Sequence, residues 1–177
     1  MTTEDLHAPV LPGAGASDYE RYLRTDELLA LQKTEEERVH HDELLFQTVH
    51  QSSELWLKFA TTEVDEGAAH LERGEISAAL RLLRRSVLSM QYVTTQIEML
   101  DQMDPWEYQQ IRVVLGHGSG FDSPGFRRVS KVTQRVSRAF DQLLESAGLE
   151  LTELYRHSRE HEQRPAPPNG GTGEARE

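Results

Sequence analysis

The sequence contains no cysteine, so disulfide bonds, thiolate-bound metals and cysteine nucleophiles are excluded. It is also poor in positive charge, because 19 Lys and Arg residues stand against 30 Asp and Glu, for a net charge of −11. Nucleic acids and anionic membranes bind basic patches, so we expect neither as a partner. No apolar run approaches the roughly 20 residues that cross a bilayer, and the N-terminus lacks the apolar segment of a secretory signal. These absences favour a cytoplasmic protein.

The 177 residues suit one domain with tails. Residues 1–17 hold two prolines and two glycines and show little periodicity, so they are predicted to be a mobile N-terminal arm. Residues 164–177 are rich in proline and glycine and are predicted to be a disordered tail. The helical domain is therefore expected over residues 18–163.

Apolar residues recur at helical spacing, and no stretch keeps the alternation of a strand. The first predicted helix begins at Ser17 or Asp18 and carries Leu28 and Leu29, and the second runs from residue 34 to Gly74. A third covers Ile76–Met103, and a short fourth follows Pro105. The last covers Phe126–Gln163, with a break at Ala147–Gly148. The second helix, with roughly 38 residues, would be more than about 50 Å long. The fold class is therefore all-α, a helical bundle with one long central helix.

Two polar residues, His50 and Glu54, interrupt the apolar face of the long helix one turn apart. The imidazole is expected in a partly apolar setting among Phe46, Val49 and Trp56, which disfavours its charged form. A neutral imidazole suits ligand binding and proton handling near neutral pH. The alternative is a core histidine whose hydrogen bond is satisfied by Glu54 or by a backbone carbonyl.

The inward faces of the helices are also predicted from the spacing. On the long helix the apolar positions are Leu44, Leu45, Val49, Leu55, Trp56 and Phe59. On the third helix they are Leu80, Leu83, Val87, Met90 and Ile97.

Arg112 lies one turn from Tyr108 on the helix that leads into a glycine-rich loop, residues 116–125. A guanidinium there can hold a carboxylate by two parallel hydrogen bonds, or it can pair with a nearby surface acid. Ser119 in the loop can hydrogen-bond a ligand or satisfy the loop backbone. A loop so rich in glycine usually has a shaped role.

Taken in order, these motifs are more informative than any one of them. The chain reads Tyr19-x-x-Tyr-Leu, His41-Asp-Glu-x-x-Phe46, His50-Gln-x-x-Glu-Leu-Trp-x-Lys58, Arg112 and Ser119-Gly-Phe-x-Ser123. This order resembles the haem-dependent tryptophan 2,3-dioxygenase family over about residues 19–128.

The resemblance implies a role for each matching residue. His50 corresponds to the distal histidine that hydrogen-bonds the indole N–H, and Phe46 and Tyr108 correspond to walls of the indole pocket. Arg112 corresponds to the arginine that holds the amino-acid carboxylate, and Ser119 to the loop serine near the haem and bound oxygen.

A second implication concerns the assembly. Tyr19, Tyr22 and Leu23 correspond to residues that a neighbouring subunit lends to the site. The resemblance therefore implies a homo-oligomer of intertwined helices, a tetramer or a dimer.

The resemblance weakens toward the C-terminus, where the family places its proximal histidine after several helices that this chain lacks. Arg156-His157 is the best match to the arginine–histidine pair of the family, so His157 is the expected axial ligand. His161, one turn further, is the alternative, and both could equally be solvated histidines. Thr172 follows at about the family's spacing and is the candidate for binding the substrate ammonium group.

The resemblance implies haem b as cofactor, with L-tryptophan or a close indole amino acid and O2 as substrates, and N-formylkynurenine as product. Ile97 replaces an aromatic residue of the family and Asp122 replaces a glutamine, and either change could alter the substrate. One alternative is a haem-dependent aromatic oxygenase or hydroxylase of secondary metabolism. The other is a helical protein that binds haem or an indole without turnover.

Overall fold

The computed structural model describes residues 8–162, and all regular structure in this range is helical. The elements are α1 (Asp18–Leu23), α2 (Thr25–Leu29), α3 (Glu43–Glu72), α4 (Ile76–Ile97), the 3-10 helix η1 (Glu98–Gln102), α5 (Pro105–Val114), the 3-10 helix η2 (Gly120–Asp122), α6 (Pro124–Ala147) and α7 (Leu151–Glu162). The predicted all-α fold is confirmed. None of the described helices is both long and apolar enough to cross a membrane.

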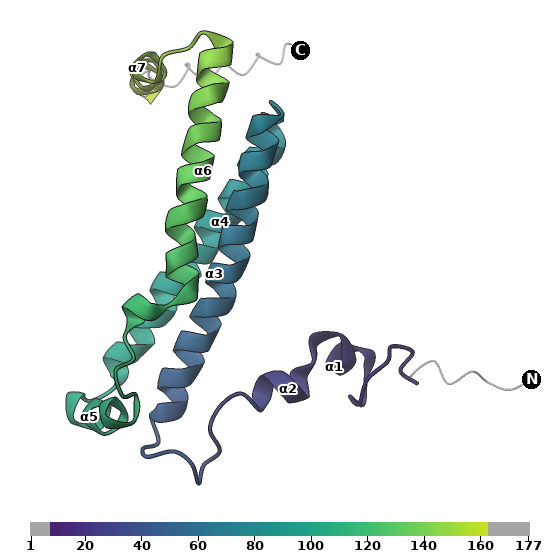
Figure 1. Ribbon diagram of the computed structural model, residues 1–177, viewed down its shortest axis with the longest axis vertical. Coiled ribbons are helices and arrows are strands. Elements are labelled where there is room, and N and C mark those ends of the chain that lie inside the picture. Colours follow the sequence, from purple (N-terminus) through teal and green to yellow (C-terminus); the bar gives the residue numbers. More distant parts are fainter. Residues whose placement is uncertain (1–7, 163–177) are drawn as a thin grey trace, which may run out of the picture.

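The 30-residue helix α3 is the centre of the molecule, as predicted. It packs against both α4 and α6, and the three helices form an elongated bundle (Figure 1). A core cluster joins them where Ala68 and Leu71 of α3 meet Ala79 of α4 and Ala139 of α6. Because most of these side chains are methyl groups, the helix backbones can approach closely.

The predicted start of the long helix near residue 34 was wrong. α3 begins at Glu43, and residues 34–42 form turns and bends. Glu37 accepts a hydrogen bond from the backbone N–H of Thr34 at 2.9 Å, and Glu43 accepts one from the N–H of Val39 at 2.9 Å. Such bonds from side chain to backbone compete with helix formation, so this acid-rich stretch does not extend the helix.

The segment before α3 is held against it by side chains of α3. Gln47 accepts a hydrogen bond from the backbone N–H of Lys33 at 2.9 Å, and Gln51 donates to the carbonyl of Leu31 at 3.3 Å. The Lys33 ammonium group lies 2.5 Å from the carboxylate of Glu43, whose side chain is only 3% exposed. These bonds therefore fix the direction in which residues 31–33 approach the start of α3.

The predicted inward face of α4 was wrong in part, because only Leu83 and Met90 of its five residues are half-buried. Its buried residues are Ala79, Leu82, Ser86, Ser89 and Val93. Leu80, Val87 and Ile97 are exposed instead. Leu55 and Trp56 of α3 are likewise exposed, whereas the neighbouring Leu57 is fully buried. The third helix also ends earlier than predicted, at Ile97, and continues as η1.

Helix α6 is tied to α3 by an arginine and ends at a glycine. Arg135 donates to both carboxylate oxygens of Glu72, at 3.1 and 3.0 Å, and to Asp65 at 2.7 Å. The hydrogen bonds that Arg135 donates to Glu72 raise the pKa of Arg135 and lower the pKa of Glu72. Gly148 adopts a left-handed conformation with φ of 64°, which ends α6 at the predicted break.

The first predicted helix is split in two. Ser17 caps α1 as expected, but Arg24 adopts a left-handed conformation, with φ of 54°, that separates α1 from α2. The Asp18 carboxylate accepts hydrogen bonds from the N–H groups of Leu11 and Val10, at 2.7 and 2.9 Å, and these bonds lower its pKa. Both short helices lie away from the bundle (Figure 1).

Candidate functional site

The position of α5 is set by its cap and by one buried residue. Asp104 accepts a hydrogen bond from the N–H of Trp106 at 2.8 Å, and Pro105 occupies the first position of the helix. Ile111 is 0% exposed, so it holds α5 against the bundle. Tyr108 and Arg112 are one turn apart on the same face of α5.

A hollow of about 460 Å³ lies where the start of α3 meets α5 and the glycine-rich loop. Its lining residues come from three segments and are Phe46, His50, Glu54, Tyr108, Arg112, Leu115, Gly118, Ser119, Gly120 and Ser123. Five residues predicted from the sequence to form a site therefore line one hollow, although 73 positions separate the first from the last (46 to 119). The α3 contribution follows helical geometry, because its lining residues are spaced by four.

The hydrogen bond of His50 fixes the position of its proton. Nδ1 lies 2.7 Å from the backbone oxygen of Phe46, and a carbonyl oxygen only accepts, so Nδ1 is the donor. In the neutral ring, Nε2 is therefore an acceptor. The Phe46 ring lies 4.1 Å from the imidazole between centroids, and the Tyr108 ring lies 6.1 Å from Phe46. The hydrogen-bond acceptor Nε2 of His50 thus lies beside the aromatic rings of Phe46 and Tyr108.

The surroundings of His50 differ in part from those expected. The residue is exposed rather than partly buried, and Phe46 is its aromatic neighbour. Trp56 packs on Tyr92 of α4 instead, with ring centroids 4.9 Å apart. Of the two expected partners of His50, the backbone carbonyl is the observed one, whereas Glu54 bonds to Ser123 and Gly125.

Arg112 is already connected to the loop by one of its five N–H groups. Its Nη1 donates to the carbonyl of Gly116 at 2.8 Å. The side chain is half-buried in the rim of the hollow. Its other N–H groups remain able to bind an anion such as a carboxylate.

The loop has its own internal bonds. The Ser119 hydroxyl accepts from the N–H of Phe121 at 3.3 Å, and the Asp122 carboxylate accepts from the N–H of Ser119 at 3.1 Å. The Ser119 hydroxyl therefore satisfies the loop backbone, one of the two alternatives, and the residue also lines the hollow; a hydrogen bond from Ser119 to a ligand stays a prediction.

Glu54 connects the loop to α3, a role that no pattern in the sequence predicted. Its carboxylate accepts hydrogen bonds from the hydroxyl of Ser123 and from the N–H of Gly125. The only local signal was its position one turn after His50.

A second hollow, of about 570 Å³, adjoins the first and shares Ser119 and Gly120 with it. Its other lining residues are Phe121, Phe126 and Arg127. Phe121 is 94% exposed. Two aromatic rings with a guanidinium beside them suit a flat apolar group that carries carboxylates.

The structure does not bring the remaining predicted residues to this site. Tyr19, Tyr22 and Leu23 lie on α1, are exposed, and lie away from the bundle (Figure 1). His157 and His161 are on α7, at the opposite end of the bundle from α5 (Figure 1). Thr172 lies outside the described residues.

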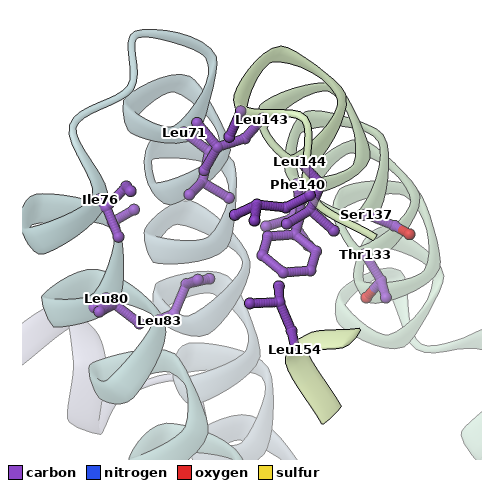
Figure 2. A pocket seen from close by; sticks show the side chains of 14 residues that line it. Leu71, Ile76, Leu80, Leu83, Thr133, Ser137, Phe140, Leu143, Leu144 and Leu154 are labelled. Atoms are coloured by element: carbon purple, nitrogen blue, oxygen red, sulfur yellow. The ribbon is translucent and has the colours of Figure 1, made fainter. Parts of the chain in front are cut away.

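The end of the bundle near α7 has an apolar groove of about 510 Å³. Leu71, Phe140 and Leu154 surround it, and the hydroxyl groups of Thr133 and Ser137 lie at its edge (Figure 2). It lacks the convergent polar groups that orient a small ligand. The hollow between α3, α5 and the loop is therefore the better candidate site.

The fit of these residues to haem is partial. Among the side chains that the structure describes, no three from His, Asp or Glu are grouped so that they could hold a metal ion. Haem needs only one axial histidine, and the aromatic second hollow suits its edge. However, among the residues that the structure describes, His50 is the one histidine that lines either hollow.

The fold and the site define a helical protein with an aromatic-walled hollow that also presents a hydrogen-bond acceptor and a guanidinium. The chain belongs to the tryptophan 2,3-dioxygenase family, which matches residues 5–158.

Its relatives agree with this assignment. A tryptophan 2,3-dioxygenase of Xanthomonas campestris pv. campestris (strain B100) is 41% identical over 115 residues, which cover 65% of this chain and 39% of the relative. One of Saccharopolyspora erythraea is 37% identical over 139 residues, covering 78% of this chain and 46% of the relative. The chain thus spans less than half the length of these relatives.

Proposed function

We propose that this chain acts as a haem-dependent dioxygenase that inserts O2 across the indole C2–C3 bond of L-tryptophan, or of a close indole amino acid, to give N-formylkynurenine. The observation that carries the proposal is the single hollow in which Phe46, His50, Tyr108 and Arg112 meet. The aromatic rings of Phe46 and Tyr108 suit the indole ring of tryptophan. The acceptor on His50 suits its indole N–H, and the Arg112 guanidinium suits its carboxylate.

His50 would orient the indole. Its Nδ1–H is engaged by the carbonyl of Phe46, so the neutral ring presents a lone pair on Nε2 to the indole N–H. Phe46 and Tyr108 would pack on the ring faces or edges. The indole would thereby be held in one orientation before any bond changes, which lowers the entropic part of the barrier.

Arg112 would hold the substrate carboxylate. It can do so while its Nη1 still donates to Gly116, so binding of the substrate and order in the loop would reinforce each other. Ser119 would lie beside the reacting end of the substrate. Thr172, outside the described residues, remains our candidate for the ammonium group.

Haem would supply the binding and activation of dioxygen. Phe121, Phe126 and Arg127, which line the second hollow, would help to hold the haem. His157 remains the proposed axial ligand and His161 the alternative. Because α7 lies at the other end of the bundle, that ligand would have to come from α7 of a neighbouring copy or after α7 moves.

A neighbouring copy would also contribute Tyr19, Tyr22 and Leu23 to the substrate side. Their exposure on a segment that leads away from its own bundle supports this role. The working form would then be a homo-oligomer.

One observation favours a second candidate function. Within the part of the chain that the structure describes, His50 has no second histidine beside it in the lining of either hollow. A protein that binds an indole amino acid without turnover would need only the first hollow.

The test combines haem titration with product analysis. We expect a stoichiometric Soret band, and mass spectrometry of products from tryptophan and O2 should show a gain of two oxygen atoms. Arg112→Ala should keep the band but raise KM for tryptophan about 10- to 100-fold, the value of a charged hydrogen bond. Arg138→Ala, an exposed arginine on α6, is the control.

The outcomes separate the candidates. Tryptophan binding without a Soret band would favour the non-catalytic function. The absence of both would contradict both candidates. Loss of the band in His161→Ala but not in His157→Ala would reassign the axial ligand.

A further inference from the structure

Glu54 is the only α3 side chain of the hollow that bonds directly to α6. Its Oε1 accepts a hydrogen bond from the Ser123 hydroxyl, and its Oε2 accepts one from the N–H of Gly125 at 3.0 Å. The partners lie 69 and 71 positions further along the chain. The carboxylate therefore fixes two segments that are distant in sequence.

Both partners belong to the start of α6. The first N–H groups of a helix have no partner within the helix, and a negative charge is favourable there. Ser123 is also the N-cap, because its hydroxyl accepts from the N–H of Phe126 at 3.1 Å. Glu54 thus bonds to the cap and to the second helical residue together, which leaves this end of α6 little freedom to shift along α3.

The contact is as close as the backbone allows. A Cβ atom on Gly125 would lie 2.7 Å from Cβ of Leu57 and 2.8 Å from Oε2 of Glu54. Glycine at this position lets the N–H of α6 reach the carboxylate. The close approach of Gly125 to α3 and the hydrogen bond from its N–H to Glu54 therefore depend on each other.

The anchored residues are the end of the loop that carries Ser119. At its other end, Gly116 accepts the hydrogen bond from Arg112. The loop is thus held at both ends, by α5 and by α3. His50 stands one turn before Glu54 on the same helix, so one rigid element carries both the imidazole and the loop anchor.

We propose that Glu54 is a positioning residue, whose carboxylate sets the loop so that Ser119 faces His50 across the hollow. It is not the residue that orients the imidazole, because His50 bonds to the carbonyl of Phe46 and both Glu54 oxygens are engaged by α6. Its effect on tryptophan rests on the proposed function, whereas its effect on the loop does not.

The experiment compares Glu54→Ala, Glu54→Gln and Ser123→Ala with the unchanged chain. Hydrogen exchange of the amides of residues 116–126, followed by mass spectrometry, needs no substrate. In Glu54→Ala we expect this exchange to be at least about tenfold faster while α4 exchanges as before. Glu54→Gln keeps an acceptor for Gly125 and should restore most of the protection.

In the haem-loaded chain the same variants are assayed with tryptophan. Glu54→Ala should raise KM by about tenfold or more with a smaller fall in kcat, because an unanchored loop leaves Arg112 less well held. Ser123→Ala should give a smaller effect. Glu66→Gln, an exposed carboxylate on the same helix, should change nothing.

Unchanged loop exchange in Glu54→Ala would overturn the proposal, as would equal acceleration in every helix. A loosened loop with an unchanged KM would overturn it too. A chain without any turnover would contradict the proposed function alone, and loop exchange would then decide the role of Glu54.

Discussion

At the scale of single residues, Gly125 marks the tightest contact between α3 and α6. Gly125→Ala should destabilise the protein by about 1–3 kcal/mol, the usual cost of overpacking, because its Cβ would overlap Leu57 and Glu54. Urea unfolding measures this difference. Gly120→Ala is the control, since nothing lies within 4 Å of its Cβ, and it should stay within about 0.5 kcal/mol of the parent. Equal stabilities for the two variants would contradict the predicted contact.

Individual site residues were predictable where a local pattern carries them. Tyr108 and Arg112 lie on the same face of α5 because they are four residues apart, and Pro105 marks the start of this helix. The bonds of Glu54 were not predictable in this way, because its partners are in a loop some 70 positions away and no spacing rule connects them. The exposure of His50 escaped prediction for a similar reason, since Trp56 turns toward α4.

At the scale of elements, spacing predicted the existence of the helices better than their faces and ends. On α4, a row of small residues and a row of large apolar residues both recur at helical spacing. Which of the two rows is buried depends on the helix that packs against α4. Close packing against α3 selects the row with Ala79 and Ser86, and leaves Leu80 and Val87 outside. The start of α3 was missed because the carboxylates of Glu37 and Glu43 accept hydrogen bonds from backbone N–H groups of the preceding stretch.

Glu43, the first residue of α3, should make stability depend on pH. Burial acts to raise the pKa of its carboxyl, but the hydrogen bonds from Lys33 and Val39 outweigh burial and lower the pKa. In the pH range below the ordinary glutamate pKa, the unfolded chain binds more protons than the folded one. The stabilisation from Glu43 is therefore complete above that pKa and is lost as the pH falls through the lowered value.

Two variants test this dependence. Glu43→Gln should cost about 1–3 kcal/mol at pH 7, the penalty for a weakened buried hydrogen bond to a charge, and the cost should shrink toward pH 3. Lys33→Met should flatten the same slope by removing the ammonium partner. Urea midpoints from pH 7 to pH 3 give the comparison. A constant difference between Glu43→Gln and the parent at all pH values would contradict the assignment.

At the scale of the whole molecule, the segment before α3 exposes large apolar side chains away from the bundle. Tyr22 is 78% exposed and Leu29 is 73% exposed. Exposed apolar patches of this kind mark interaction surfaces. The sequence suggested an intertwined oligomer only through family resemblance, because a single chain cannot show which residues another copy covers.

We predict that the chain sediments as a dimer or tetramer at equilibrium. Changing Tyr22 and Leu29 together to glutamate should shift it toward the monomer, because charges are costly in an apolar interface. Val113→Glu makes the same kind of change at an exposed position on α5 and should leave the mass unaltered. Sedimentation of the parent chain as a monomer would contradict this prediction.

The hydrogen bonds of Gln47 and Gln51 to residues 31–33 bear on how such an assembly would form. They hold residues 31–33 on α3, so we expect the direction in which the chain leads to α1 and α2 to be restricted before any encounter. Binding of α1 and α2 to a neighbouring copy would then cost little conformational entropy. The same restriction would limit productive collisions to a narrow range of orientations, which favours long-lived complexes over quickly formed ones.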